Sequence, residues 1–118
     1  MKTRKNFTCP LELTHDITKG KWKLITLWLL GKSTHSLSSL KNSIKGISQK
    51  MLLEQLKELQ EYDLVRKKEF SGYPLKVEYY ITDRGRKMAG AIKIMQDIGI
   101  EILLEEGKED ILKEKGLI

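Results

Sequence analysis

Residues 46–65 read GISQKMLLEQLKELQEYDLV, a glycine followed by an amphipathic helical pattern. The leucines recur at i, i+4 and i+7, so they share one face of a helix over residues 48–62. These leucines are Leu52, Leu56 and Leu59. Ser48 stands where an N-cap is needed, and Gly46 allows a tight turn before it. The stretch therefore predicts a turn and a helix that buries one side only.

Three more helices are predicted before this turn. The first begins at Pro10, because proline suits the first helical position. Cys9 is its N-cap, and Glu12 is placed to accept a hydrogen bond from the Cys9 backbone N–H. The second helix covers residues 21–31, and its final glycine is the predicted C-cap. Ser36 caps the third helix.

The pattern changes after the helix at 48–62. Residues 65–70 (VRKKEF) and 77–82 (VEYYIT) are rich in β-branched and aromatic residues, which favour strands. Serine, glycine and proline between them are typical of a turn, so the two runs predict a hairpin. Thr82 then caps a long helix over about 83–105, with apolar residues at a three-four spacing.

Helices joined by a short turn and followed by a two-stranded hairpin form a winged helix-turn-helix. We therefore predict an α+β fold, mainly α, as a single domain over residues 1–118. Residues 9–82 form the predicted DNA-binding core, in which 65–82 are the wing. Residues 83–106 form the predicted long C-terminal dimerisation helix, and a short amphipathic helix follows at 108–115.

The net charge of +6 is distributed unevenly along the chain. Residues 1–76 hold 15 Lys or Arg and 7 Asp or Glu, whereas residues 77–118 hold 7 and 9. The basic part is the predicted face for phosphate. The longest apolar run, at 24–30, is too short to span a membrane, and one cysteine cannot form an internal disulfide. We therefore expect a cytoplasmic protein with no membrane partner.

The predicted DNA contacts come from the start of the helix at 48–62 and from the wing. Glutamine can pair with adenine and lysine with guanine, while basic residues on a wing suit phosphate. The candidates are Ser48, Gln49, Lys50, Leu53 and Lys57 on the helix, and Lys68 and Lys76 on the wing. Glu54 shares the open face of the helix. It either accepts from cytosine or pairs with Lys50 or Lys57.

Three stretches resemble the HxlR family of bacterial transcription regulators, relatives of the MarR-type winged helices. They are CPLELTHDITKGKWKLITLWLL at 9–30, GISQKMLLEQLKELQEYDLV at 46–65 and VEYYITDRG at 77–85. The resemblance covers about residues 9–100 and implies a homodimeric DNA-binding regulator. Ser39 and Leu53 depart from the family pattern, which usually has an acidic residue and a small polar residue there. The second departure bears on base preference.

The long helix at the end of a small domain has little core left to cover. Its apolar stripe is therefore the predicted dimer interface, which the resemblance also implies. The residues are Met88, Ile92, Met95, Ile98 and Ile102. Two-fold protein symmetry reads two half-sites, so the predicted partners are double-stranded DNA and a second copy of the chain.

Cys9 is the one candidate for sensing oxidants or electrophiles. A thiol is more reactive at the positive end of a helix with cations nearby. The cations near it in sequence are Arg4, Lys5, Lys19 and Lys21. Some family members with a cysteine at the matching position respond to such agents, and the resemblance implies the same for this chain. The alternative is a semi-buried thiol that only helps to start the helix.

Other functions have little support in the residues. His15 and His35 are isolated, so no metal site is predicted. No nucleophile–base pair or glycine-rich phosphate loop is present, so neither an enzyme nor a cofactor is expected. Two alternatives stay open. One is a winged-helix protein-interaction module that does not read DNA, and the other is a regulator with a non-covalent small ligand between the long helix and the core.

Overall fold

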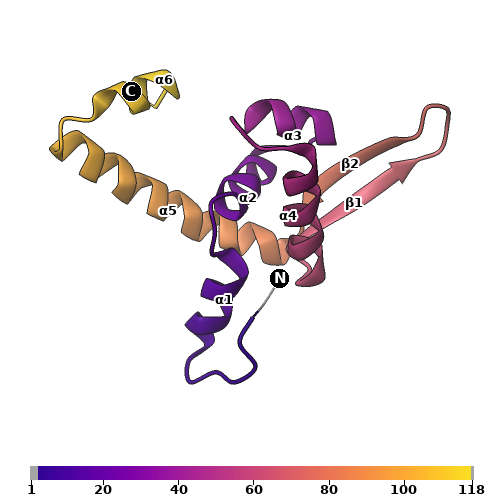
Figure 1. Cartoon of the computed structure of the whole chain (residues 1–118), viewed down its shortest axis with the longest axis horizontal. Helices are drawn as coiled ribbons and strands as arrows, with labels where there is room; N and C mark the ends of the chain where they lie inside the picture. The colour runs from indigo at the N-terminus through magenta and orange to yellow at the C-terminus, as the bar shows by residue number, and fades with distance from the viewer. Residues whose placement is uncertain (1–2, 118) are drawn as a thin grey trace.

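The computed structural model describes residues 3–117. Its elements are α1 (Pro10–Thr18), α2 (Lys23–Lys32), α3 (Leu37–Ser43), α4 (Gln49–Glu61), β1 (Val65–Phe70), β2 (Lys76–Ile81), α5 (Asp83–Glu105) and α6 (Glu109–Glu114). The predicted winged helix-turn-helix and its long helix are confirmed. In Figure 1, α2, α3 and α4 form the centre, and the wing, α1 and α5 project from it in three directions. Across residues 3–117, every helix falls short of the length or apolar character that crossing a membrane requires.

The core lies between α2, α4 and the base of the wing. The three leucines predicted on the inner face of α4 are fully buried. Around them lie buried residues from α2, α3 and the wing: Leu27, Leu30, Leu40, Val65 and Ile81. This core holds α4 with its opposite face open to solvent.

Three predicted helix caps are confirmed. Ser36, Ser48 and Thr82 each accept a hydrogen bond from the backbone N–H three residues later, at 3.2, 3.1 and 3.0 Å. Gly46 has a φ of +88°, the left-handed conformation that the tight turn between α3 and α4 requires. Local chemistry therefore fixes where α3, α4 and α5 begin.

Gly31 is not the C-cap that the sequence predicts. The helix ends one residue later, with Ser33 as its C-cap. Gly31 instead faces α5, where an added Cβ would lie 3.0 Å from the Cβ of Ala89. At Gly85, near the start of α5, an added Cβ would overlap the carbonyl oxygen of Leu64. The two glycines therefore let α5 approach both α2 and the base of the wing.

The start of α5 is fastened to the end of α4. The Thr82 hydroxyl donates to the Asp63 carbonyl oxygen at 2.6 Å, and the Thr82 N–H donates to the Leu64 carbonyl oxygen at 3.1 Å. The Arg84 guanidinium also donates to the Tyr62 carbonyl oxygen, at 3.0 Å. These bonds fix the direction in which α5 leaves the core.

Candidate nucleic-acid interface

The open face of α4 forms a shallow hollow of about 430 Å³. It is lined by Gln49, Lys50, Leu53, Glu54 and Lys57. Four of these are predicted DNA contacts, so the fold brings them together on one exposed surface. Ser48 lies just before them, and its hydroxyl oxygen is engaged in capping α4.

The acidic residues of α4 do not all face this hollow. Glu58 is largely buried, and its carboxylate pairs with the ammonium of Lys23, a buried residue of α2. Among the ion pairs within residues 3–117, none joins Glu54 to Lys50 or Lys57. Glu54 was expected either to pair with one of these lysines or to accept from cytosine. Without the ion pair, its carboxylate is open to a partner outside the chain.

A second, larger hollow of about 720 Å³ separates α3 and the start of α4 from the wing. Its basic side chains come from α3 and β1: Lys41 and Lys67. The predicted contact Lys76 borders the hollow, but its register partner is Phe70, so its side chain starts on the opposite face of the wing. Gln49 borders this hollow as well as the one on α4. The Lys76 ammonium is directed to Glu78 and the Phe70 ring on the opposite face of the wing. Lys41 and Lys67, which were not among the predicted contacts, are the lysines beside the start of α4.

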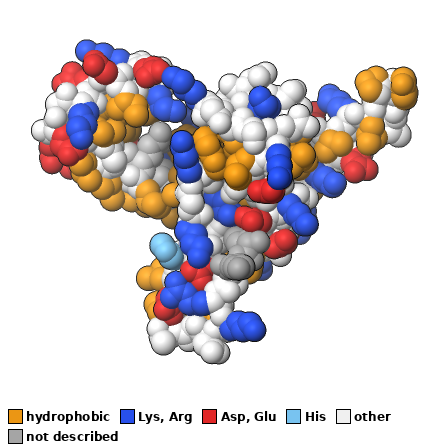
Figure 2. Space-filling model, viewed as in Figure 1, with side chains coloured by type: hydrophobic (Ala, Val, Ile, Leu, Met, Phe, Trp, Pro, Cys, Tyr) orange, Lys and Arg blue, Asp and Glu red, His pale blue; other side chains and the backbone are white. Residues whose placement is uncertain are grey.

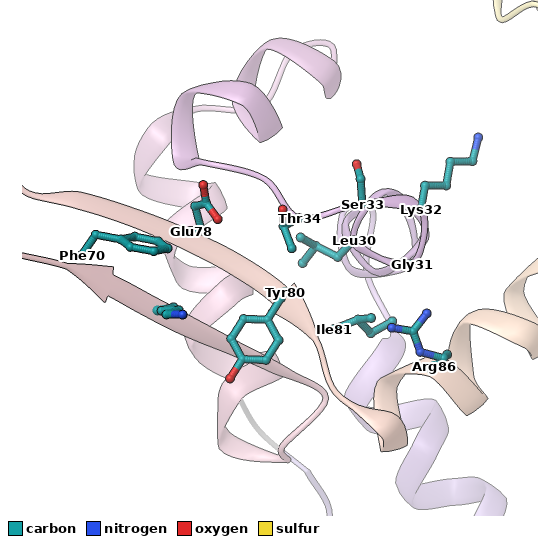
Figure 3. Close-up of a pocket in the computed structure, with 11 residues that line it drawn as sticks. Leu30, Gly31, Lys32, Ser33, Thr34, Phe70, Glu78, Tyr80, Ile81 and Arg86 are labelled. Atoms are coloured by element: carbon teal, nitrogen blue, oxygen red, sulfur yellow. The ribbon is translucent and has the colours of Figure 1, made fainter.

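The two faces of the wing differ. Lys67 pairs with Tyr79 in the strand register, and both side chains lie on the face toward the helices. Lys68 points to the other face, because successive strand residues alternate. There it lines a third hollow, of about 560 Å³, with Tyr80 from the wing and Arg86 from α5 (Figure 3). The predicted contact Lys68 is therefore on the face opposite Gln49.

Several wing charges already have partners. The Arg66 guanidinium donates to the Asp63 carboxylate at 2.7 and 3.0 Å. The Lys76 ammonium lies 3.3 Å from a Glu78 carboxylate oxygen, in an exposed pair. Such exposed pairs are weak, so Lys76 can exchange its carboxylate for a phosphate at little cost.

Cys9 is exposed at the N-cap of α1, and its backbone N–H donates to the Glu12 carboxylate at 3.0 Å, as predicted. The predicted cationic surroundings are mostly directed elsewhere. The Arg4 guanidinium donates to Asp16 at 2.8 Å and to Glu12 at 2.6 Å. Lys19 lies 4.0 Å from the Asp16 carboxylate, and Lys21 stands over the Trp22 ring. The fold therefore makes the thiol of Cys9 accessible, but it does not surround the thiol with the predicted cations.

The same contacts tie the N-terminal segment to α1. The Arg4 backbone N–H donates to the Asp16 carboxylate at 2.9 Å, in addition to the bonds from its side chain. Asp16 is buried, and hydrogen bonds from the Arg4 side chain and backbone hold the pKa of its carboxyl well below its usual range. The N-terminal segment is therefore bound to α1 at Arg4 and at Thr8, whose backbone N–H donates to Glu12, although its polar sequence is typical of a loose end.

The five residues predicted for a dimer interface fall into two groups. Ile92 is buried in the core, and Met88 is half-buried against it. Met95, Ile98 and Ile102 are 53%, 50% and 49% exposed on the outer part of α5. Figure 2 shows a row of hydrophobic side chains along the arm formed by α5. The apolar surface left for a partner is therefore on the outer three.

A small hollow of about 310 Å³ lies between α2 and α5. It is lined by Leu24, Ile25, Trp28, Ile92, Met95 and Gln96, so it is mostly apolar. Its position is the one considered for a non-covalent ligand. Within residues 3–117, no group of three or more His, Cys, Asp or Glu side chains is placed to hold a metal ion.

Comparison with known proteins places this geometry among regulators. A family model described as HxlR-like helix-turn-helix matches residues 17–106. A Fusobacterium mortiferum protein that bears the name of regulatory protein MalR is 42% identical over 100 residues. The match covers 83% of this chain and 94% of that protein.

Two solved structures extend the likeness. One, from Porphyromonas gingivalis W83, is described as a transcriptional regulator of the MarR family and superposes with a TM-score of 0.77 at 32% identity. The superposition covers 85% of this chain and 98% of the Porphyromonas gingivalis chain. The other, the redox regulator HypR in its reduced form, has a TM-score of 0.74 at 29% identity, over 90% of this chain and 99% of its own.

Proposed function

This chain belongs to the HxlR-like helix-turn-helix family and is a transcriptional regulator, and we propose that it binds a two-fold-symmetric DNA operator as a homodimer. The observation that carries the proposal is the place of Gln49, which borders both the hollow on α4 and the basic hollow beside the wing. A helix start in the major groove and cations on the adjacent phosphates are the arrangement that duplex DNA requires.

Each part of this surface has a defined role in the proposal. Gln49 and Lys50 read base edges, and Leu53 offers an apolar contact to a thymine methyl group. Glu54 accepts from a cytosine amine and repels the acceptors of guanine, so it selects bases as well as contacting them. Lys41 and Lys67 contact phosphates, as do Lys57 on the groove wall and Lys68 and Lys76 on the outer face of the wing.

Selection of bound duplexes from a random pool, followed by titration of the recovered duplex at several salt concentrations, tests this function. We expect a distinct site preference and a steep fall of affinity with salt. Equal affinity for all duplexes, or none for any, would instead support the protein-interaction alternative.

The lysines provide a sharper measurement. Lys67→Gln or Lys76→Gln should weaken binding to all duplexes and reduce the salt slope by about 1, since each removes one phosphate contact. Lys113→Gln, on α6, removes the same charge far from the wing and should leave the slope unchanged. Gln49→Ala should change the recovered sequence rather than the slope. An unchanged slope for both wing variants would remove the wing from the interface.

The dimer is proposed from the outer part of α5. Met95, Ile98 and Ile102 leave an apolar stripe in solvent, which a second α5 would cover. An isologous contact of this kind has two-fold symmetry and therefore presents two copies of α4 to two half-sites.

The proposal also includes a response to oxidants through Cys9. Its sulfur is exposed, and HypR, a structural relative, is described as a redox regulator. With one cysteine per chain, disulfide formation must join two chains or add a small thiol, and alkylation is the route for electrophiles. Diamide should release DNA from the parent protein, while the Cys9→Ser variant should stay bound. Equal release from both would leave Cys9 a structural residue.

The hollow between α2 and α5 supports the ligand alternative less well. Its lining is shared with the exposed part of α5, so a second copy bound there would cover the same surface. A response to a small apolar ligand that persists in Cys9→Ser would favour this alternative over the thiol.

A further inference from the structure

The tip of the wing is apolar and points into solvent. Tyr73 is fully exposed, at 103% of its reference surface, and Leu75 is 61% exposed. Pro74 lies between them, so three consecutive residues at the tip carry no charge. Figure 2 shows this hydrophobic group at the far end of the wing, at the upper right. A solvated turn gains nothing from such side chains, which indicates a partner that covers them.

The surroundings of the tip indicate that the partner is DNA. Pro74 and Leu75 line the same hollow as Gln49, so the tip is continuous with the reading end of α4. The wing just behind the tip carries Lys67, Lys68 and Lys76, all exposed. An apolar tip on a basic stem suits a polyanion that has an apolar interior within reach, and a stacked duplex is such a molecule.

The dimensions agree with this assignment. Strands of six residues at about 3.3 Å per residue carry the tip about 20 Å beyond the base of the wing. With α4 in the major groove, the hollow holds the adjacent sugar-phosphate backbone. The next feature beyond that backbone is the minor groove, about 6 Å wide in B-DNA, which admits side chains but not a helix.

We propose that Tyr73 and Leu75 form an apolar wedge that enters the minor groove beside α4 and bends the duplex by partly unstacking a base step. This rests on the proposed DNA-binding function and adds to it a means of selecting sequence without hydrogen bonds. Pyrimidine–purine steps unstack most easily, so the wedge favours operators that carry such a step under the wing.

The test uses the full-length protein and the duplex recovered by selection. A donor and an acceptor dye at its two ends report bending, and 2-aminopurine beside the wing site reports unstacking. We expect the Tyr73→Ala/Leu75→Ala variant to bind about tenfold more weakly, with the bend and the 2-aminopurine signal lost. The salt slope should stay unchanged, because no phosphate contact is removed. Folding is not at risk, since both side chains lie in solvent.

Two further variants, one single and one double, separate a wedge from a general attraction to DNA. Tyr73→Phe keeps the ring and should bind and bend as the parent does. Tyr73→Lys adds a cation, so it should increase the salt slope without restoring the bend in a Leu75→Ala background. Parent-like bending by the double alanine variant would overturn the wedge.

Other results would overturn the proposal in distinguishable ways. If the double alanine variant changes the sedimentation mass in the absence of DNA, the tip contacts a second copy instead. If the parent itself shows no site preference, the DNA-binding function fails, and the wedge fails with it. A parent that binds its selected duplex without bending it or raising the 2-aminopurine signal overturns the wedge alone.

Discussion

On α4, Leu52, Leu56 and Leu59 are fully buried, whereas on the outer part of α5 the apolar residues leave about half of their surface in solvent. Both helices have apolar residues at a three-four spacing, so the pattern alone does not separate them. The difference lies in what surrounds them. α4 is enclosed by α2, α3 and the wing, while the outer part of α5 extends away from the centre (Figure 1).

One region buries its apolar stripe within a single chain, whereas the other keeps apolar surface that the proposed dimer would cover. Burying one large apolar side chain contributes about 1.5–3 kcal/mol, and the core obtains this from its own helices. The stripe on α5 obtains it only from a second molecule. We therefore expect substitutions in the first region to change the stability of the fold, and substitutions in the second to change assembly.

The largest effect is expected where the two regions meet, at Gly85. An added Cβ would overlap the Leu64 carbonyl oxygen and crowd Ile81, and neither can move without disturbing the core. Gly85→Ala should therefore lower the free energy of unfolding by about 3 kcal/mol or more. Urea unfolding followed by circular dichroism at 222 nm measures it.

Gly90→Ala is the matched control, since a Cβ at Gly90 meets nothing within 4 Å. It should raise stability slightly, because alanine is favoured over glycine in a helix by about 1 kcal/mol. Equal stability of the two variants would mean that the approach of α5 to the wing base is looser than the structure has it.

The next effect is on assembly. Ile98→Glu/Ile102→Glu should weaken self-association by at least about 100-fold, because it places charges in the stripe that a second copy would bury. Helix content should stay the same, since both side chains are about half exposed in one chain. Sedimentation equilibrium gives the association constant. Lys93→Glu, on the opposite side of α5, is the control, and an equal loss there would show a general charge effect.

The smallest effect concerns α1, which is held partly by charge. Because the pKa of Asp16 is lowered in the fold, its pairing with Arg4 stabilises the protein above the ordinary aspartate pKa of about 4. This contribution is lost as the pH falls below that value. Arg4→Gln should therefore be less stable than the parent at neutral pH, and the difference should shrink below about pH 4. Unfolding curves from pH 7 to pH 2 measure it.

Lys93→Gln serves as the control for the pH series, because its pair with Asp97 is exposed on the arm. It should stay close to the parent at every pH. If Arg4→Gln differs from the parent by the same amount at pH 2 and pH 7, the pairing with Asp16 does not stabilise the fold.

The boundaries of helices and strands were predictable where they depend on interactions between residues close together in the sequence. Ser36, Ser48 and Thr82 cap helices through their own hydroxyl groups, and each prediction is confirmed. The strand predicted at 65–70 agrees in both its ends with β1. Hydrophobic period and turn residues decide such features within a few neighbours, so one sequence is enough to find them.

Features that depend on distant partners were not predictable in this way. Gly31 follows an apolar run and resembles a C-cap, and only the placement of α5 shows that it faces Ala89. Ile92 continues the stripe of α5 but lies where that helix still touches the core. Arg4 was expected near the Cys9 thiol because it is close in sequence, whereas in the fold its guanidinium donates to Asp16.

The candidate interface was predictable in part. The period of α4 identified the residues of its open face, which the structure brings together. On the wing, basic content alone did not separate Lys67 from Lys68. Alternation along a strand places them on opposite faces, but the register with Tyr79 is needed to know which face meets the helices.

The hydrogen bonds of Thr82 to Asp63 and Leu64 have a mechanical consequence. They tie the start of α5 to the turn that follows α4, so a change in the direction of α5 would be passed to α4. In a pair of copies, the angle at which the arms cross would set the gap between the two reading ends. DNA offers that gap only in steps of one helical turn, about 34 Å. In the proposed complex, a signal that changes the crossing angle would release the operator by altering the distance between the two copies, without removing any contact between α4 and the bases.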